Sequence, residues 1–155
     1  LIDAFASKHC VALLRAPQEL TEVVRFGPMG EQSRIINRTL SNPDFCKYVV
    51  VAFPEELPVI EGLELARDIE TVVGIKPRLI MNRWQDLSGP ILSEHPMEEH
   101  LMRFQRHLQK VHQRQQELLV TVQEKFSPTI LPQVFEVDFL KVVGHLTKAL
   151  SEVKI

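Results

Sequence analysis

The sequence predicts an α/β protein whose mostly parallel sheet is flanked by helices. A short apolar run rich in β-branched residues, Tyr48 to Phe53, predicts a strand buried on both faces. Apolar residues then recur at steps of three and four from Ile60 to Val73, which predicts a helix. A second short apolar run covers Leu79 to Met81. A strand, a helix and a strand in this order form a βαβ unit, whose strands are nearly always parallel.

Turn and capping residues mark the limits of these elements. Glu55-Glu56 and Pro58 favour a helix start, and Gly74 favours its end. The first strand runs into Pro54-Glu55 and the second into Asn82-Arg83. Ligands of parallel sheets bind beyond the carboxyl ends of the strands. These two segments of the βαβ unit, residues 48–83, are therefore the first candidates for a binding site.

Size and composition indicate a single domain over residues 1–155. The chain is 45% hydrophobic and 25% charged, which suits one ordinary core. A net charge of -2 gives no reason to expect nucleic acid or an acidic membrane as the main partner. Cys10 and Cys46 occur in no metal or disulfide pattern, and a reducing cytoplasm is the expected setting. No apolar run reaches the roughly 18 residues needed to span a bilayer.

The βαβ segment resembles the arsenite-pump ATPase (ArsA) family, which includes the ATPases that deliver tail-anchored membrane proteins. Family members carry the pattern VVVTxPEExPVxE and then VVVNR. Here these stand as Val49 to Glu61 and as Leu79 to Arg83, at the family's spacing. The resemblance implies a partial P-loop NTPase-like fold of the SIMIBI type, with ATP and Mg²⁺ as cofactors of the parent protein. It also implies that Asn82 and Arg83 bind the nucleotide, since the Asn82 amide suits the adenine edge.

The first nine residues resemble the family's second switch loop, DAPATGHALALLRAP. The matching segments are Asp3-Ala4, Ala6-Ser7, His9 and Ala12 to Pro17. The resemblance makes Asp3 and His9 catalytic candidates, with Asp3 meeting a Mg²⁺-bound water; without it, Asp3 reads as a turn or capping residue. Phe5 and Lys8 replace the family's proline and glycine. Either the switch is degenerate and hydrolysis is weakened or lost, or Lys8 supplies a compensating cation.

Helices are expected on both sides of a turn at Gly27 to Gly30. The first covers about residues 11–26 and the second residues 31–40, with Ile35, Ile36 and Leu40 on its buried side. Residues 84–96 are polar and are expected to form a loop. For Trp84, packing at the strand end is favoured over stacking on a nucleotide base.

A long helix is predicted over residues 97–126. Its apolar positions follow a heptad-like pattern, broken by one glutamine: Met97, Leu101, Phe104, Leu108, Val111, Gln115, Leu118 and Val122. This seam predicts packing along another helix, either of the same chain or of a second copy. His100, His107 and His112 are seven and five residues apart, which does not fit the i, i+4 spacing of a shared zinc. No metal site is predicted there.

The last segment, residues 129–155, is predicted to hold a strand at 129–131 and a helix from Asp138. Between them the sequence resembles the family's adenine-binding loop, although the family's glycine after the valine is missing. The resemblance makes four residues candidates for nucleotide binding, namely Pro132, Phe135, Glu136 and Val137. The helix is expected to turn six apolar residues inward: Phe139, Val142, Val143, Leu146, Leu150 and Val153.

The functional expectation is part of an ArsA-like ATPase that couples ATP hydrolysis to transport or targeting of a client. The glycines nowhere form G-x-x-x-x-G-K-[ST], so this chain is expected to supply the base-recognition side and to be inactive alone. Expected partners are a missing N-terminal half or a second subunit, and a homo-oligomer is favoured by an exposed sheet edge. The alternative is a non-catalytic scaffold that pairs through residues 97–122. A Gly-rich loop ending in Lys-Thr or Lys-Ser upstream of Leu1 would favour the ATPase.

Overall fold

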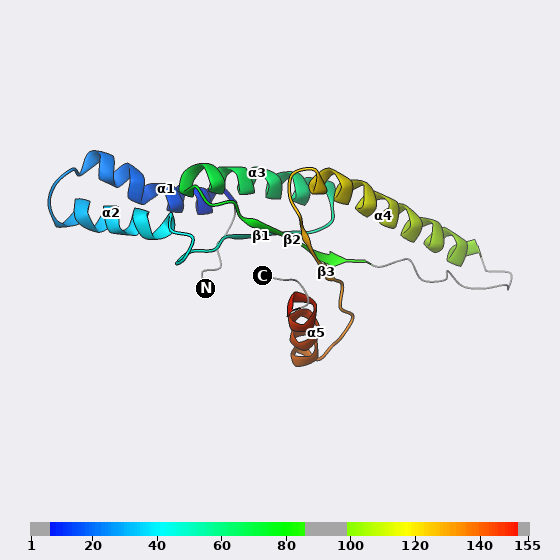
Figure 1. Cartoon of the computed structure of the whole chain (residues 1–155). Helices are drawn as coiled ribbons and strands as arrows, with labels where there is room; N and C mark the ends of the chain where they lie inside the picture. Colours follow the sequence, from blue (N-terminus) through cyan, green and yellow to red (C-terminus); the bar gives the residue numbers. More distant parts are fainter. Residues whose placement is uncertain (1–6, 86–98, 152–155) are drawn as a thin grey trace. The chain divides into compact units, whose positions relative to one another are not determined.

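The protein has an α/β fold with a small three-stranded parallel sheet (Figure 1). The computed structural model describes residues 7–85 and 99–151. Strand β2 (Arg78–Trp84) lies between β1 (Val49–Ala52) and β3 (Thr129–Pro132). The described residues also form five helices: α1 (Ser7–Val23), α2 (Pro28–Leu40), α3 (Glu56–Val73), α4 (Glu99–Gln123) and α5 (Phe139–Ser151). Since α3 connects β1 to β2, the predicted strand-helix-strand order and the parallel sheet are confirmed.

The chain divides into two compact units. One contains the residues up to Val50 together with Ile60–Leu79, and the other contains Val51–Val59 and the residues from Ile80 onward. In the described part of the chain, no helix is both long enough and apolar enough to cross a membrane.

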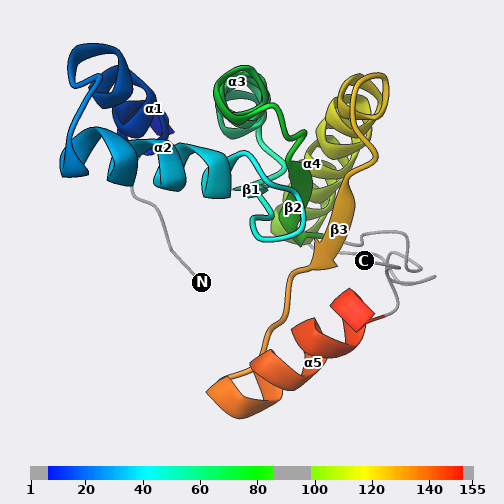
Figure 2. The same ribbon diagram turned by 60° about the vertical axis from the view of Figure 1, so that its left-hand side comes forward.

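In the first unit, α1 and α2 form a helical hairpin, and Figure 2 shows the two helices side by side. Gly30 permits the tight turn, because a Cβ atom there would overlap the carbonyl oxygen of Val24. The buried side of α2 therefore carries Gly30 and Ser33. Ile35 and Ile36 are 53% and 46% exposed, so the prediction that they are buried is wrong. Ile35 and Ile36 lie on other sides of α2 than Gly30, whose side of the helix packs against Val24.

The hydroxyl of Tyr48 connects the approach to β1 with the end of α2. It donates a hydrogen bond of 2.8 Å to the carbonyl oxygen of Leu40. Burial, followed by interactions with Cys46 and Cys10, raises the pKa of Tyr48 to about 12. Burial also raises the pKa of the Cys10 thiol. The folded unit therefore favours the neutral phenol.

Tyr48 is the only tyrosine of the chain, so its ionisation can be followed directly by absorbance at alkaline pH. We expect a native midpoint of about pH 12 and, in urea, a midpoint near pH 10.0, the ordinary pKa of a tyrosine. The pKa of Tyr48 is higher in the folded protein than in the unfolded chain, so the neutral phenol contributes to the free energy of unfolding. This contribution is fully present below pH 10 and is lost as the pH rises towards 12. Tyr48→Phe should abolish the absorbance change, and a native midpoint equal to that in urea would contradict the expectation.

The side chains of strand β1 are alternately exposed and buried. Val50 and Ala52 are buried, whereas Val49 and Val51 are 52% and 58% exposed. The prediction of a strand buried on both faces is therefore wrong, since the described residues cover only one face. Successive side chains of a strand point to opposite faces, which gives this alternation directly.

Helix α3 begins and ends as its sequence predicts. Its first turn carries Glu56, and the amide of Val59 donates to the carbonyl oxygen of Glu55. At the other end Gly74 has a φ of 73°, a left-handed conformation that favours glycine. The Gly74 amide donates to the carbonyl oxygen of Glu70, which satisfies one of the last carbonyls of the helix.

The long helix of the second unit, α4, is packed over only part of its length. Gln115 and Val122 are buried, at 4% and 0% exposure. Leu101 and Phe104 in the first turns are 47% and 57% exposed. The predicted long helix is confirmed within the described residues, but its apolar seam is covered only toward the C-terminal end.

Helix α5 follows β3 and has its predicted cap. The carboxylate of Asp138 accepts a hydrogen bond of 2.9 Å from the amide of Leu140. None of the helix residues is buried, and Phe139 is 74% exposed. The prediction that its apolar residues point into a core is thus wrong for residues 139–151, because the described chain places no covering layer over them; Val153 lies outside the described residues.

Candidate functional site

The end of β2 departs from regular strand geometry at Asn82-Arg83. The pairing of β2 with β3 shifts register between Met81 and Trp84, as expected for a β-bulge. Arg83 has a φ of 60° and is the only non-glycine residue with positive φ in the described ranges. The Asn82 carboxamide oxygen accepts a hydrogen bond of 2.9 Å from the Arg83 amide, which supports this turn. Bulges often redirect side chains at binding sites.

The turn sends the Arg83 side chain over Phe53, at the end of β1. The guanidinium carbon lies 4.9 Å from the centroid of the Phe53 ring, within the range of a cation–π interaction. Beyond the bulge, the amide of Gln133 donates a hydrogen bond of 2.8 Å to the carbonyl oxygen of Trp84. This bond ties the chain after β3 to the end of β2.

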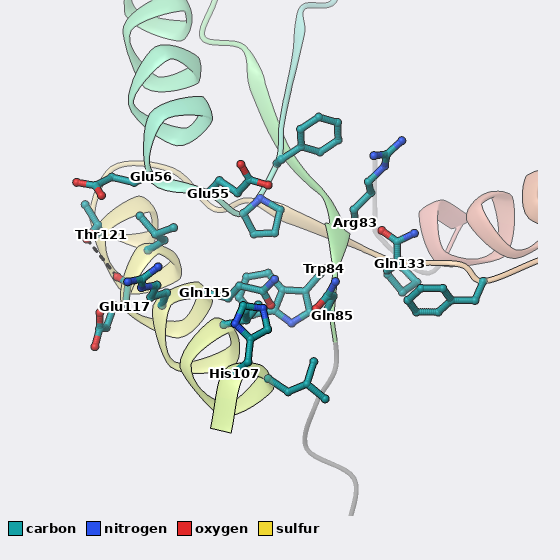
Figure 3. A pocket seen from close by; sticks show the side chains of 18 of the residues that line it. Glu55, Glu56, Arg83, Trp84, Gln85, His107, Gln115, Glu117, Thr121 and Gln133 are labelled. Carbon is teal, nitrogen blue, oxygen red and sulfur yellow. Dashed lines mark hydrogen bonds between the residues drawn. The ribbon is translucent and has the colours of Figure 1, made fainter. Parts of the chain in front are cut away.

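An open hollow of about 1760 Å³ lies at the carboxyl ends of the three strands (Figure 3). Its lining includes residues that follow β1, residues at the end of β2, residues at and after β3, and one side of α4. All of its lining residues belong to the second compact unit. The hollow is thus at the edge where parallel sheets bind ligands.

Four aromatic side chains belong to this lining. Phe53, Trp84, Phe104 and Phe135 all border the hollow. Trp84 is only 9% exposed, whereas Phe135 is 87% exposed. Aromatic rings present flat apolar faces on which another planar ring can stack. The hollow therefore offers ring faces on which a planar ligand could stack.

Charged side chains around the hollow carry both signs. The acids are Glu55, Glu56 and Glu117, and the permanent cations are Arg83 and Arg114. His107 and Gln115 also line it from α4, as Figure 3 shows. Three carboxylates outnumber two guanidinium groups, so the lining offers no net attraction to a polyanion.

The structure brings together only part of the site expected from the sequence. Arg83, Pro132 and Phe135 line the hollow, whereas Asn82 adjoins it through its neighbour Arg83. Glu136 and Val137 are not among the lining residues. Asp3 lies outside the described residues, and His9 is exposed in the first turn of α1.

The carboxylate of Glu136 is engaged in local structure. Its Oε1 atom accepts hydrogen bonds from the amides of Val137 and Asp138, at 3.0 and 3.3 Å. Its Oε2 atom lies 3.9 Å from the Lys141 ammonium group. These contacts stabilise the entry to α5. Val137 itself is fully exposed.

Several lining residues were not assigned to the site from the sequence. Phe53 was included in a strand, Phe104 in an apolar helical seam, and Arg114 among the outer charges of the helix. Trp84, for which packing was favoured, is indeed largely buried, yet it also lines the hollow. Its position directly after Asn82-Arg83 was the one signal in the sequence that pointed to this role.

Comparisons with known proteins do not extend these observations. The chain matches no family model and no curated protein sequence. Among the described residues, no three His, Cys, Asp or Glu side chains lie close enough together to hold a metal ion. The kinship to ArsA-like ATPases stays a prediction made from the motifs of the sequence.

Proposed function

We propose that this chain is part of an ArsA-like ATPase that couples ATP binding and hydrolysis to transport or targeting of a client. In this proposal the chain supplies the side of the site that binds the adenine base. The phosphates and the Mg²⁺ ion are bound by residues outside the ranges 7–85 and 99–151. Asn82 adjoins the hollow next to Arg83, and in this proposal its amide nitrogen is the donor to the base, since its carboxamide oxygen already accepts from the Arg83 amide.

One observation carries the proposal. The ends of all three parallel strands contribute to a single hollow, and four aromatic side chains border it. Ligands of parallel α/β sheets bind at this edge, and a purine is the planar part of a nucleotide. The bulge at Asn82-Arg83, where the motif ends, is also at this edge.

The charge of the lining favours a site in which the hollow holds the base and the phosphates bind elsewhere. A triphosphate needs cations or a cradle of backbone amides, as in other phosphoryl-transfer sites. Glu55, Glu56 and Glu117 would oppose it at close range. The hollow therefore suits the base, and the phosphates belong to another part of the site.

Trp84 makes the proposal testable, because it is the only tryptophan and it lines the hollow. We expect adenosine to quench its fluorescence with a Kd of about 1 mM, a binding free energy of about −4 kcal/mol. Mg-ATP should bind no more tightly than adenosine, and calorimetry with Mg-ATP should show little or no heat. Tight, phosphate-dependent binding of Mg-ATP would overturn the proposal that the hollow binds only the base.

Two asparagine variants give a matched comparison. Asn82→Asp keeps the oxygen that accepts from the Arg83 amide but removes the NH₂ donor, so adenosine binding should be lost. Asn42→Asp is the control, because the Asn42 oxygen likewise accepts from a nearby amide, that of Asp44, at 2.9 Å. Its adenosine binding should equal that of the wild type. If both variants bind like the wild type, Asn82 does not recognise the base.

A further inference from the structure

One side of α4 lines the hollow, and a glutamine interrupts the apolar residues there. Val111 and Leu118 belong to the lining, as does Gln115. Gln115 follows Val111 by four residues and precedes Leu118 by three, so the three lie on one side of the helix. In the described ranges only Ser33 and Gln115 are both polar and buried, and Ser33 belongs to the other compact unit. Gln115 is thus the buried polar residue of this lining.

The oxygen of the Gln115 carboxamide is an acceptor without a donor. It is buried and has no hydrogen-bond partner among residues 7–85 and 99–151. Leaving a buried polar group unpaired lowers stability, and a leucine would suit this seam better. Buried polar groups of folded proteins are almost always hydrogen-bonded, so an unpaired one beside a hollow points to a ligand that supplies the partner.

Gln115 and Trp84 line the same hollow from different elements. Figure 3 shows Trp84, which ends β2, and Gln115, which belongs to α4. Trp84 provides an aromatic face, and Gln115 provides a hydrogen-bonding group. The last torsion of a glutamine side chain is soft, so the carboxamide can turn its oxygen towards the hollow. The two residues thereby offer a planar ring a stacking surface and a polar contact for its edge.

A glutamine amide matches the amino group of adenine. Adenine presents an NH₂ donor beside a ring nitrogen that accepts, and a glutamine carboxamide is complementary to both. Inosine has a carbonyl oxygen in place of the amino group, so an acceptor would face an acceptor. Purine riboside has only a C–H group there. The three bases share one ring system, so the acceptor of Gln115 distinguishes them more strongly than stacking does.

We propose that Gln115 makes the hollow selective for a 6-aminopurine by accepting a hydrogen bond from the amino group. This inference rests on the proposed function, because it requires that the hollow binds a purine base. Stacking on the aromatic rings holds the base, and the Gln115 oxygen selects which base is held. A site whose buried polar group is paired by the correct ligand rejects analogues that leave it unpaired.

The test compares adenosine, purine riboside and inosine by their quenching of Trp84 fluorescence in the full chain. The wild type should bind adenosine about tenfold more tightly than either of the other two, as expected for one added hydrogen bond. Gln115→Leu should bind all three equally, at the weaker affinity, because stacking is kept and the acceptor is lost. Circular dichroism and urea unfolding should show that this variant is folded and at least as stable as the wild type.

Gln116→Leu is the matched control, because Gln116 is exposed on α4 and does not belong to the lining. It should keep the wild-type preference for adenosine. Equal binding of the three nucleosides by the wild type, or a preference for adenosine that survives in Gln115→Leu, would overturn the role of Gln115 and leave base binding in place. Quenching by none of the nucleosides would instead overturn the proposed function, and this inference with it.

Discussion

Replacing Met81 by alanine is expected to lower the free energy of unfolding by about 3 kcal/mol. Met81 lies in the central strand β2 and has no exposed surface. Truncation removes buried apolar atoms and leaves a cavity that the surrounding strands cannot fill without moving. Urea unfolding followed by circular dichroism measures the change.

Met102→Ala is the matched control, since Met102 is 41% exposed near the start of α4. The same atoms are removed, but this side chain is already partly exposed to solvent, so the free energy of unfolding should change by less than about 0.5 kcal/mol. Equal losses in the two variants would show that β2 is not at the centre of a packed core.

Replacing Gln115 by leucine is expected to raise the free energy of unfolding by about 2 kcal/mol. Gln115 interrupts the apolar seam of α4 and is 4% exposed. Its carboxamide oxygen is buried and has no hydrogen-bond partner among the described residues, and the buried Nδ1 atom of His112 has none either. Leucine removes an unpaired polar group and completes the seam.

Gln116→Leu separates this effect from the higher helix propensity of leucine. Gln116 is the next residue on α4 and is exposed. Its replacement should leave stability within about 0.5 kcal/mol of the wild type, as is usual for surface positions. A loss of stability in Gln115→Leu would mean that the glutamine amide has a bonded partner in the folded protein.

The sequence was most informative where local chemistry decides the structure. Gly74 ended α3 because its left-handed φ is open to glycine, and Asp138 capped α5 through its own carboxylate. Both features need only neighbouring residues. The strand-helix-strand order was also predictable, since two short apolar runs stand on either side of a segment whose apolar residues recur at steps of three and four.

The sequence was least informative about which faces are covered. Ile35 of α2, Val51 of β1 and Phe139 of α5 were all expected to be buried and are exposed. Periodicity identifies an apolar face, but the segment that covers it is determined by tertiary contacts. The hollow was hard to predict for the same reason, since Phe53 and Arg114 are far apart in sequence and line the same hollow only in the folded chain.

The close approach at Gly30 gives a way to search for relatives of this chain. Any side chain at this position would collide with the Val24 carbonyl, so the α1–α2 hairpin imposes glycine whatever ligand the protein binds. Homologous sequences should therefore keep this glycine even where residues 1–9 or the proposed base-binding motif at Asn82-Arg83 have diverged. An evolutionary profile anchored on the spacing from Gly30 to the Val49–Ala52 strand would find members that a nucleotide motif misses.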